Sequence, residues 1–324
     1  MNLLSSIFGA GVQARNVLYD RGAVRARKLQ GPVVSVGNLS VGGSGKTPFV
    51  LLLGELLTAR GVKFDILSRG YGRRTRGVAP VEPGGSSRDF GDEPLLLARR
   101  LSVPVIVGED RYEAGRFAEK NFGEQLHLLD DGFQHRALGR EFDIVLVTPE
   151  DIRDRLLPAG RLREPLTSLS RADAVVLASG ASSESIPLKD KLVWRVRRGI
   201  SLTKVPCRPV AFCGIARPQN FLLQLRTAGI EPVAQALFRD HHAYTERDVH
   251  DLLKLRQQSE AEGFVTTEKD AINLGAYLSA LEPLVVVPVK MELVDAANAV
   301  DTMLRIVSER RASREKIGAV AVRP

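Results

Sequence analysis

The chain has 324 residues, of which 44% are hydrophobic and 26% charged, as is ordinary for a soluble globular protein of about two domains. Its net charge of +8 lies at the two ends, because residues 1–30 hold five Lys or Arg against one Asp and residues 305–324 hold six against two Glu. The balanced middle argues against a basic groove for nucleic acid. The basic ends suit contact with an anionic surface.

Three features that the sequence lacks indicate its cellular compartment and its relation to the membrane. Cys207 and Cys213 have no metal-type spacing, which indicates a reducing compartment without a disulfide framework. No run reaches the roughly 18 apolar residues that a membrane span needs. The apolar start over residues 1–10 lacks the basic leader of a secretory signal.

The first 30 residues predict a helix with apolar and basic positions, among them Leu3, Leu4 and Ile7 and later Arg21 and Arg25. Such a helix can lie on a membrane surface. It can equally pack on its own domain, and the sequence leaves both interpretations open.

The segment 33–48, VVSVGNLSVGGSGKTP, is the most informative part of the chain. It predicts a buried strand, a glycine-rich loop and a helix that begins at Lys46-Thr47, the order that a polyphosphate site requires. Lys46 would reach the β- and γ-phosphates, and the Thr47 hydroxyl can hold Mg²⁺. Ser40 stands where the usual motif has its first glycine. The residues expected at the nucleotide are Ser40, Val41, Gly42, Gly43, Ser44, Gly45, Lys46 and Thr47.

Short apolar runs alternate with helical patterns through the first half of the chain. The expected strands are 32–37, 63–68, 103–107, 125–129, 142–147 and 173–178, and the expected helices are 47–60, 92–101, 110–121 and 163–171. This alternation predicts an α/β fold with a doubly wound, mostly parallel sheet of the P-loop NTPase type.

A second alternation follows and predicts a smaller α/β domain. Its expected strands are 209–213, 232–236, 263–266 and 284–288, and its expected helices are 217–228, 246–259 and 270–281. Thr245 and Asp248 have the spacing of a capping box. The expected organisation is an N-terminal membrane-associating helix region (1–30), a P-loop domain (31–180), a connection (181–206), the smaller domain (207–308) and a frayed basic tail (309–324).

Polar residues follow several of the expected strands. Asp130 and Asp131 end one of them, and in a P-loop fold such carboxylates lie beside the phosphates, where Mg²⁺ needs oxygen ligands. A surface Asp-Asp-Gly turn is the alternative. Asp92 and Glu93 precede a helix, where they either serve the site or stabilise the helix dipole. Arg69 follows another strand, at a place where it could meet phosphate.

Taken together, the motifs resemble the tetraacyldisaccharide 4′-kinase family of lipid A biosynthesis. The matching segments occur in family order at 37–48, 68–72, 91–94, 130–135, 157–160 with 162–164, 240–241 and 267–271. The resemblance implies transfer of the ATP γ-phosphate to the 4′-hydroxyl of a lipid-linked glucosamine disaccharide 1-phosphate, which gives lipid IVA. It also implies a peripheral protein on the cytoplasmic face of the bacterial inner membrane.

The resemblance further implies roles for individual residues. Asp92 and His241 would form a catalytic pair across the two domains that acts as the general base, in which Asp92 either charges the imidazole or takes the proton itself. Lys46 would bind the phosphates. Mg²⁺ would be held by Thr47, Asp130 and Asp131, with Glu93 a further candidate, and substrate by Arg69, Tyr71 and Arg163. A regulatory ATPase and a membrane-surface binding protein are the competing hypotheses.

Overall fold

Two sheets organise the chain. The computed structural model describes residues 3–123, 126–178, 186, 188, 190–200, 202 and 205–320. The larger sheet has nine strands in the order β13-β8-β7-β6-β1-β5-β2-β4-β3, and the smaller has four in the order β10-β9-β11-β12. All pairs in the smaller sheet are parallel, and in the larger sheet only the edge strands β13 and β3 run antiparallel.

The strands of the larger sheet are β1 (Val33–Asn38), β2 (Phe64–Ser68), β3 (Ala79–Pro80), β4 (Val105–Val107), β5 (Leu126–Asp130), β6 (Phe142–Val147), β7 (Ala174–Ala178), β8 (Leu192–Ile200) and β13 (Val289–Leu293). Its helices are α1 (Leu3–Asp20), α2 (Lys46–Thr58), α3 (Ser87–Phe90), α4 (Asp92–Leu101), α5 (Arg111–Asn121), α6 (Pro149–Arg153), the 3₁₀ helix η1 (Leu166–Arg171) and α10 (Ala296–Val320). The smaller sheet contains β9 (Pro209–Cys213), β10 (Ala234–Leu237), β11 (Gly263–Thr267) and β12 (Leu284–Val287), with α7 (Pro218–Thr227), α8 (Glu246–Gln258), α9 (Glu268–Leu274) and the 3₁₀ helix η3 (Gly275–Leu281).

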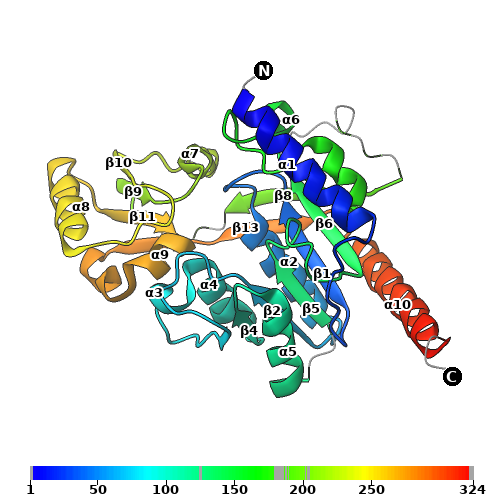
Figure 1. The fold of residues 1–324 in the computed structure, drawn as a ribbon. Coiled ribbons are helices and arrows are strands. Elements are labelled where there is room, and N and C mark those ends of the chain that lie inside the picture. The colour runs from blue at the N-terminus through cyan, green and yellow to red at the C-terminus, as the bar shows by residue number, and fades with distance from the viewer. Residues whose placement is uncertain are drawn as a thin grey trace.

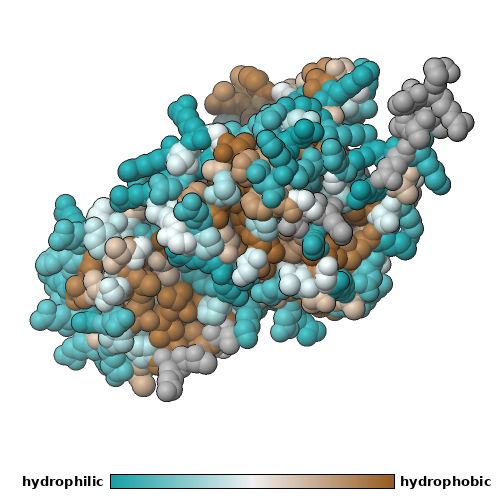
Figure 2. Space-filling view, turned by 90° about the horizontal axis from the view of Figure 1, so that it is seen from below, coloured by the Kyte–Doolittle hydropathy of each residue, from teal (hydrophilic) through white to brown (hydrophobic). Residues whose placement is uncertain are grey.

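Helices cover both faces of the larger sheet, as the sequence pattern predicts. Side chains alternate along each strand, so that Val34 of β1 packs in one core with α2, α4 and α10, while Val33 packs in another core with α5. Figure 1 shows the smaller sheet with α7, α8 and α9 as a second lobe beside the larger one. Viewed from below, both lobes carry hydrophobic areas bordered by hydrophilic residues (Figure 2).

The segment expected as a connection contains a strand of the large sheet. Residues 192–200 form β8, which pairs with β7, and the rest of that expectation lies partly outside the described residues. Trp194 is buried and stacks on Phe142 with 6.1 Å between ring centroids. The alternation of apolar and charged residues over 193–197 is therefore that of a strand with one buried face. Residues 289–293 were expected in the smaller domain without a strand of their own, but they form β13 and pair with β8 of the large sheet.

The C-terminal segment is a helix and not a frayed tail as far as it is described, because α10 extends to Val320. Its basic residues are used against the large lobe. Arg310 pairs with Asp173 at 2.7 Å, and Arg314 pairs with Glu141 at 2.7 Å and donates to the carbonyl of Leu29 at 2.8 Å. These contacts hold the helix against the sheet.

The helix expected over 163–171 is also shorter than the pattern suggested, since only the 3₁₀ helix η1 forms there. Glu164 is fully buried and binds the N-terminal helix, with its carboxylate accepting from Asn16 at 2.9 Å and pairing with Arg15 at 3.3 Å. Helix α1 thus packs on its own lobe, while Leu3, Leu4 and Ile7 stay 60–73% exposed. Among the described helices, none combines the length and the hydropathy needed to cross a membrane.

Candidate active site

The glycine-rich loop lies between the carboxyl end of β1 and the first turn of α2. Gly42, Gly43 and Gly45 have φ angles of 66°, 68° and 84°, in the left-handed region that favours glycine. Lys46 is the first residue of the helix. The loop therefore has the backbone that a strand–loop–helix phosphate site needs, with the helix N-terminus directed at the same place.

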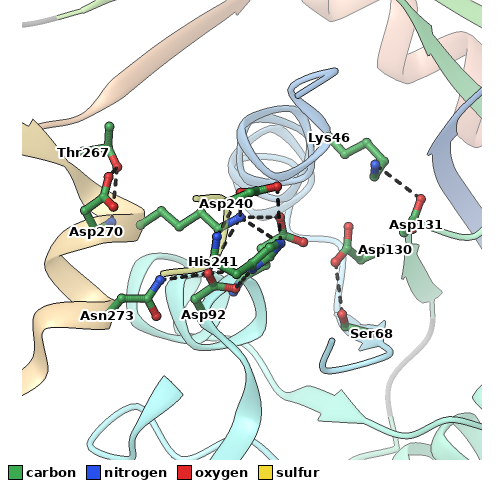
Figure 3. A network of polar contacts seen from close by, with 12 residues as sticks. Lys46, Ser68, Asp92, Asp130, Asp131, Asp240, His241, Thr267, Asp270 and Asn273 are labelled. Atoms are coloured by element: carbon green, nitrogen blue, oxygen red, sulfur yellow. Dashed lines mark hydrogen bonds and ion pairs between the residues drawn. The ribbon is translucent and has the colours of Figure 1, made fainter. Parts of the chain in front are cut away.

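Lys46 is held by two side chains at the edge of the sheet. Its Nζ donates to Asn38 Oδ1 at 3.0 Å. It also lies 3.4 Å from Asp131 Oδ1 (Figure 3). Arg163 binds the same carboxylate through both terminal nitrogens, at 2.8 and 3.0 Å. Although burial opposes ionisation, these two cations hold the pKa of Asp131 well below its ordinary value. Asp131 is thus an ionised anchor for both.

Asp130 differs from Asp131 in that its surroundings disfavour the ionised carboxylate. It is 2% exposed, and Ser68 donates to its Oδ2 at 3.1 Å, but its Oδ1 is buried without a hydrogen-bond partner. Burial, together with the nearby Glu93 and Asp131 carboxylates, raises the pKa of Asp130 to about 7. An unpartnered carboxylate oxygen beside a phosphate loop fits a bound cation.

Two hydroxyl groups of the loop and the first turn of α2 lie near the same place, that of Ser44, expected at the phosphates, and that of Thr47, expected at the cation. Ser44 Oγ is also buried without a partner, and Thr47, at the start of α2, is 9% exposed. Within the described part of the chain, no group of three or more His, Cys, Asp or Glu residues is arranged to hold a metal ion. A cation here would thus depend on hydroxyl and phosphate oxygens as well as on carboxylates, which is typical of Mg²⁺ at nucleotide sites.

Asp92 and His241 meet across the two lobes. His241 Nδ1 lies 3.0 and 2.9 Å from the two carboxylate oxygens of Asp92, and Asn273 donates to Asp92 at 3.1 Å (Figure 3). Burial opposes the charge on both partners, but their mutual hydrogen bond and attraction raise the pKa of His241 and, with Lys269 and Asn273, lower that of Asp92. His241 also has a φ of 57°, a strained conformation for a residue other than glycine.

Lys269 joins this pair to the neighbouring acids. Its Nζ lies 3.2 Å from His241 Nε2, 3.4 Å from Glu93 and 3.3 Å from Asp240. An ammonium group can only donate, so His241 Nε2 accepts and the ring proton resides on Nδ1, next to Asp92. These acids raise the pKa of Lys269 against the effect of its burial.

One pocket of about 220 Å³ brings the phosphate loop and the second lobe together. Residues 42–48 line it from one side, and His241, Lys269 and residues 215–217 line it from the other. These latter segments follow β9, β10 and β11, so the carboxyl ends of both parallel sheets converge here. Ligands bind at such strand ends in α/β proteins.

The remaining expected site residues differ in their exposure and in the groups that they contact. Arg69 is exposed at the end of β2, and the 66%-exposed Tyr71 has its ring centroid 5.3 Å from that of His241. Arg163 faces Asp131 rather than the pocket. Ser40 is fully buried and its carbonyl accepts from Asn38, while Val41 is 47% exposed.

Sequence reasoning assigned no role in the site to Arg198 and Arg217, which both line the pocket. Arg217 donates to Thr148 at 3.1 Å and pairs with Glu150 at 2.8 Å, linking the second lobe to α6. The alternation of apolar and charged residues around Trp194 indicates a strand of the large sheet. This pattern was the feature of the sequence that could have placed Arg198 in the sheet.

Comparisons with known proteins identify the family of the chain. The family model for tetraacyldisaccharide-1-P 4′-kinase matches residues 1–308. The tetraacyldisaccharide 4′-kinase of Koribacter versatilis is 51% identical, with 96% of this chain and 100% of the relative covered, and that of Chlorobaculum parvum is 41% identical, with 82% and 81% covered. The crystal structure of LpxK from Aquifex aeolicus in complex with ATP superposes with a TM-score of 0.76 at 36% identity, covering 94% of this chain and 97% of that one. The chain belongs to the tetraacyldisaccharide 4′-kinase family.

Proposed function

We propose that this chain transfers the γ-phosphate of ATP to the 4′-hydroxyl of tetraacyldisaccharide 1-phosphate and so forms lipid IVA. The observation that carries the proposal is the pocket that both Asp92-bound His241 and the phosphate loop line. A sugar hydroxyl is a weak nucleophile, so positioning and charge stabilisation must supply most of the rate.

The phosphate loop holds the nucleotide in this proposal. The N–H groups of Gly42, Gly43, Ser44 and Gly45 bind the phosphates, and Lys46 moves its contact from Asn38 and Asp131 to the β- and γ-phosphate oxygens. Arg163 stays paired with Asp131 and keeps that carboxylate compensated when the lysine moves.

Magnesium fits beside the same loop. Asp130 would hold the ion, because its Oδ1 is buried and unpartnered, and the Thr47 hydroxyl would be the second protein ligand. Asp131 and Glu93 are instead paired with Lys46 and Lys269. Bound Mg²⁺ neutralises charge on the transferred phosphoryl group.

His241 is the proton acceptor, and Asp92 acts through it. The Asp92 carboxylate is buried, occupied by three side chains and lowered in pKa, which makes it a weak base. The hydrogen bond to Asp92 keeps the ring proton of His241 on Nδ1. The lone pair of Nε2, which now accepts from Lys269, is then free to take the proton of the sugar hydroxyl. Arg69 and Tyr71 follow the carboxyl end of β2, and the Tyr71 ring lies next to His241. The acceptor would approach His241 from this side.

The protein is proposed to act as a peripheral protein on the cytoplasmic face of the bacterial inner membrane. Leu3, Leu4 and Ile7 of α1 are exposed, and Arg21 and Arg25 follow them on the surface. Apolar side chains beside basic ones suit an anionic lipid surface, to which each basic residue adds about 1 kcal/mol.

Membrane association can be measured by sedimentation with phosphatidylglycerol vesicles. Replacing Leu3, Leu4 and Ile7 by Ser should reduce the bound fraction, whereas Leu223→Ser, at a 61%-exposed site on α7, should not. Equal binding of both variants would refute the role of α1.

The activity itself is tested by transfer of labelled γ-phosphate from Mg·ATP to tetraacyldisaccharide 1-phosphate in detergent micelles. Labelled lipid should form with the unchanged chain and not with Lys46→Ala. Release of free phosphate without labelled lipid would instead identify an ATPase and refute the proposed acceptor.

A further inference from the structure

Arg198 reaches from the strand β8 to the phosphate loop. Its Nη2 donates to the carbonyl oxygen of Ser44, the residue before Gly45. A Cβ atom on Gly45 would overlap the guanidinium, so the arginine and the loop are fitted to one another. Arg198 therefore makes contact with the backbone of the loop itself, at the peptide that leads into α2.

Glu150 and Asp151 lie near enough to Arg198 to favour its positive charge, but both pair directly with Arg217. Among the described residues, no acidic side chain forms an ion pair with Arg198, and its Nε is buried without a hydrogen-bond partner. Burial and the neighbouring Arg217 lower the pKa of Arg198 by more than the two acids raise it. Arg198 is partly buried, and a bound anion would stabilise a cation in such a place.

The pocket that Arg198 lines offers one such anion. Residues 42–47 of the loop line the same pocket, and Arg217 lies over Gly43. Arg217 pairs with Glu150 at 2.8 Å and lies 3.6 Å from Asp151. Of the two guanidinium groups, Arg198 is therefore the one without a direct ion pair to a described residue, and its charge matches a polyphosphate.

We propose that Arg198 is a positioning residue for nucleotide phosphates. It holds the Ser44–Gly45 peptide in the conformation in which the N–H groups of the loop converge, and it supplies positive charge behind them. The contribution acts on the phosphates and not on the base or the ribose of the nucleotide. Its loss should therefore weaken ATP binding selectively.

The test compares Arg198→Met with Arg197→Met. Arg197 is the next residue on β8 but is exposed, so it is the matched control. Arg198→Met should raise the calorimetric Kd of ATP about 10- to 100-fold, the usual effect of losing a charged hydrogen bond. The inhibition constant of adenosine should not change, and kcat at saturating ATP should stay within a few-fold, while Arg197→Met should leave all three values unchanged.

Two outcomes would overturn the proposal. One is an unchanged Kd of ATP in a folded Arg198→Met variant, and the other is an equal loss of affinity for adenosine, which would indicate general distortion of the pocket. If the Met variant does not fold, Arg198→Lys carries the test, because Lys keeps the charge but lacks the planar fork. It should raise the Kd of ATP several-fold, and an unchanged value would refute the role of Arg198.

Discussion

His241 and Asp92 are 149 positions apart in the sequence, yet His241 Nδ1 lies within 3.0 Å of both Asp92 carboxylate oxygens. Asp92 begins α4 on the large lobe, and His241 follows the strand β10 of the smaller sheet. The contact thus exists only while the two lobes are packed together. Lys269 and Asn273 of α9 reinforce it from the second lobe.

Breaking this pair should slow the chemical step and leave ATP binding intact. We expect His241→Gln to lower kcat about 10²- to 10⁴-fold, because the proton acceptor is lost, and Asp92→Asn to lower it as well. His242→Gln is the matched control, since His242 is adjacent but binds Asp248 at 3.1 Å. The measurement is steady-state phosphate transfer with saturating ATP. Near-normal turnover of His241→Gln would contradict the proposed base.

The pH dependence of the reaction should report the same pair. His241 must be neutral to accept a proton, so kcat/KM should fall as the pH drops through its pKa, which Asp92 holds above the ordinary value of 6.5. In Asp92→Asn that support is absent, and the acid limb should move to lower pH. The check is a pH–rate profile of both proteins. An acid limb that does not move would show that another group titrates.

Magnesium affinity should depend on pH because Asp130 must be ionised to bind the ion. Its pKa is about 7 in the protein without the ion. Apparent Mg²⁺ affinity should therefore decline about tenfold for each pH unit below 7 and level off above it. Isothermal titration at several pH values measures this. Asp130→Asn should weaken binding and remove the pH dependence, and chelation of Mg²⁺ should stop phosphate transfer.

Glu164 anchors the N-terminal helix to the large lobe. Its buried carboxylate pairs with Arg171 at 2.9 Å and with Arg15 at 3.3 Å. Glu164→Ala should lower the free energy of unfolding by about 3–5 kcal/mol, as expected when a buried pair loses one partner. Glu231→Ala, which removes an exposed pair with Arg226, should cost less than about 1 kcal/mol. Denaturant unfolding compares them, and equal effects would contradict the anchor.

Much of the fold could be predicted because its signals are local. The apolar runs at β1, β2, β5 and β6 and the helical patterns between them lie within one or two residues of the observed elements. The capping box of Thr245 and Asp248 was confirmed for the same reason, since its hydrogen bonds span three residues. Local propensity and periodicity carry this kind of information.

The failures occur where distant segments decide the outcome. Strand β8 was taken for a connection, because its pairing with β7 and β13 and the stacking of Trp194 on Phe142 cannot be inferred from residues 192–200 alone. Residues 309–320 were expected as a frayed tail, but Asp173 and Glu141 bind their arginines and hold the helix. In each case long-range pairing overrode the local pattern.

The sequence by itself determined the phosphate loop. Its strand, glycines and helix start all lie within residues 33–48, so their backbone geometry depends on neighbours in the chain. Only the tertiary structure decided what faces that loop. Arg198, His241 and Lys269 come from three separate segments. Their distances to the loop follow from the packing of two sheets, whose contacts are too far apart in sequence for local preferences to encode.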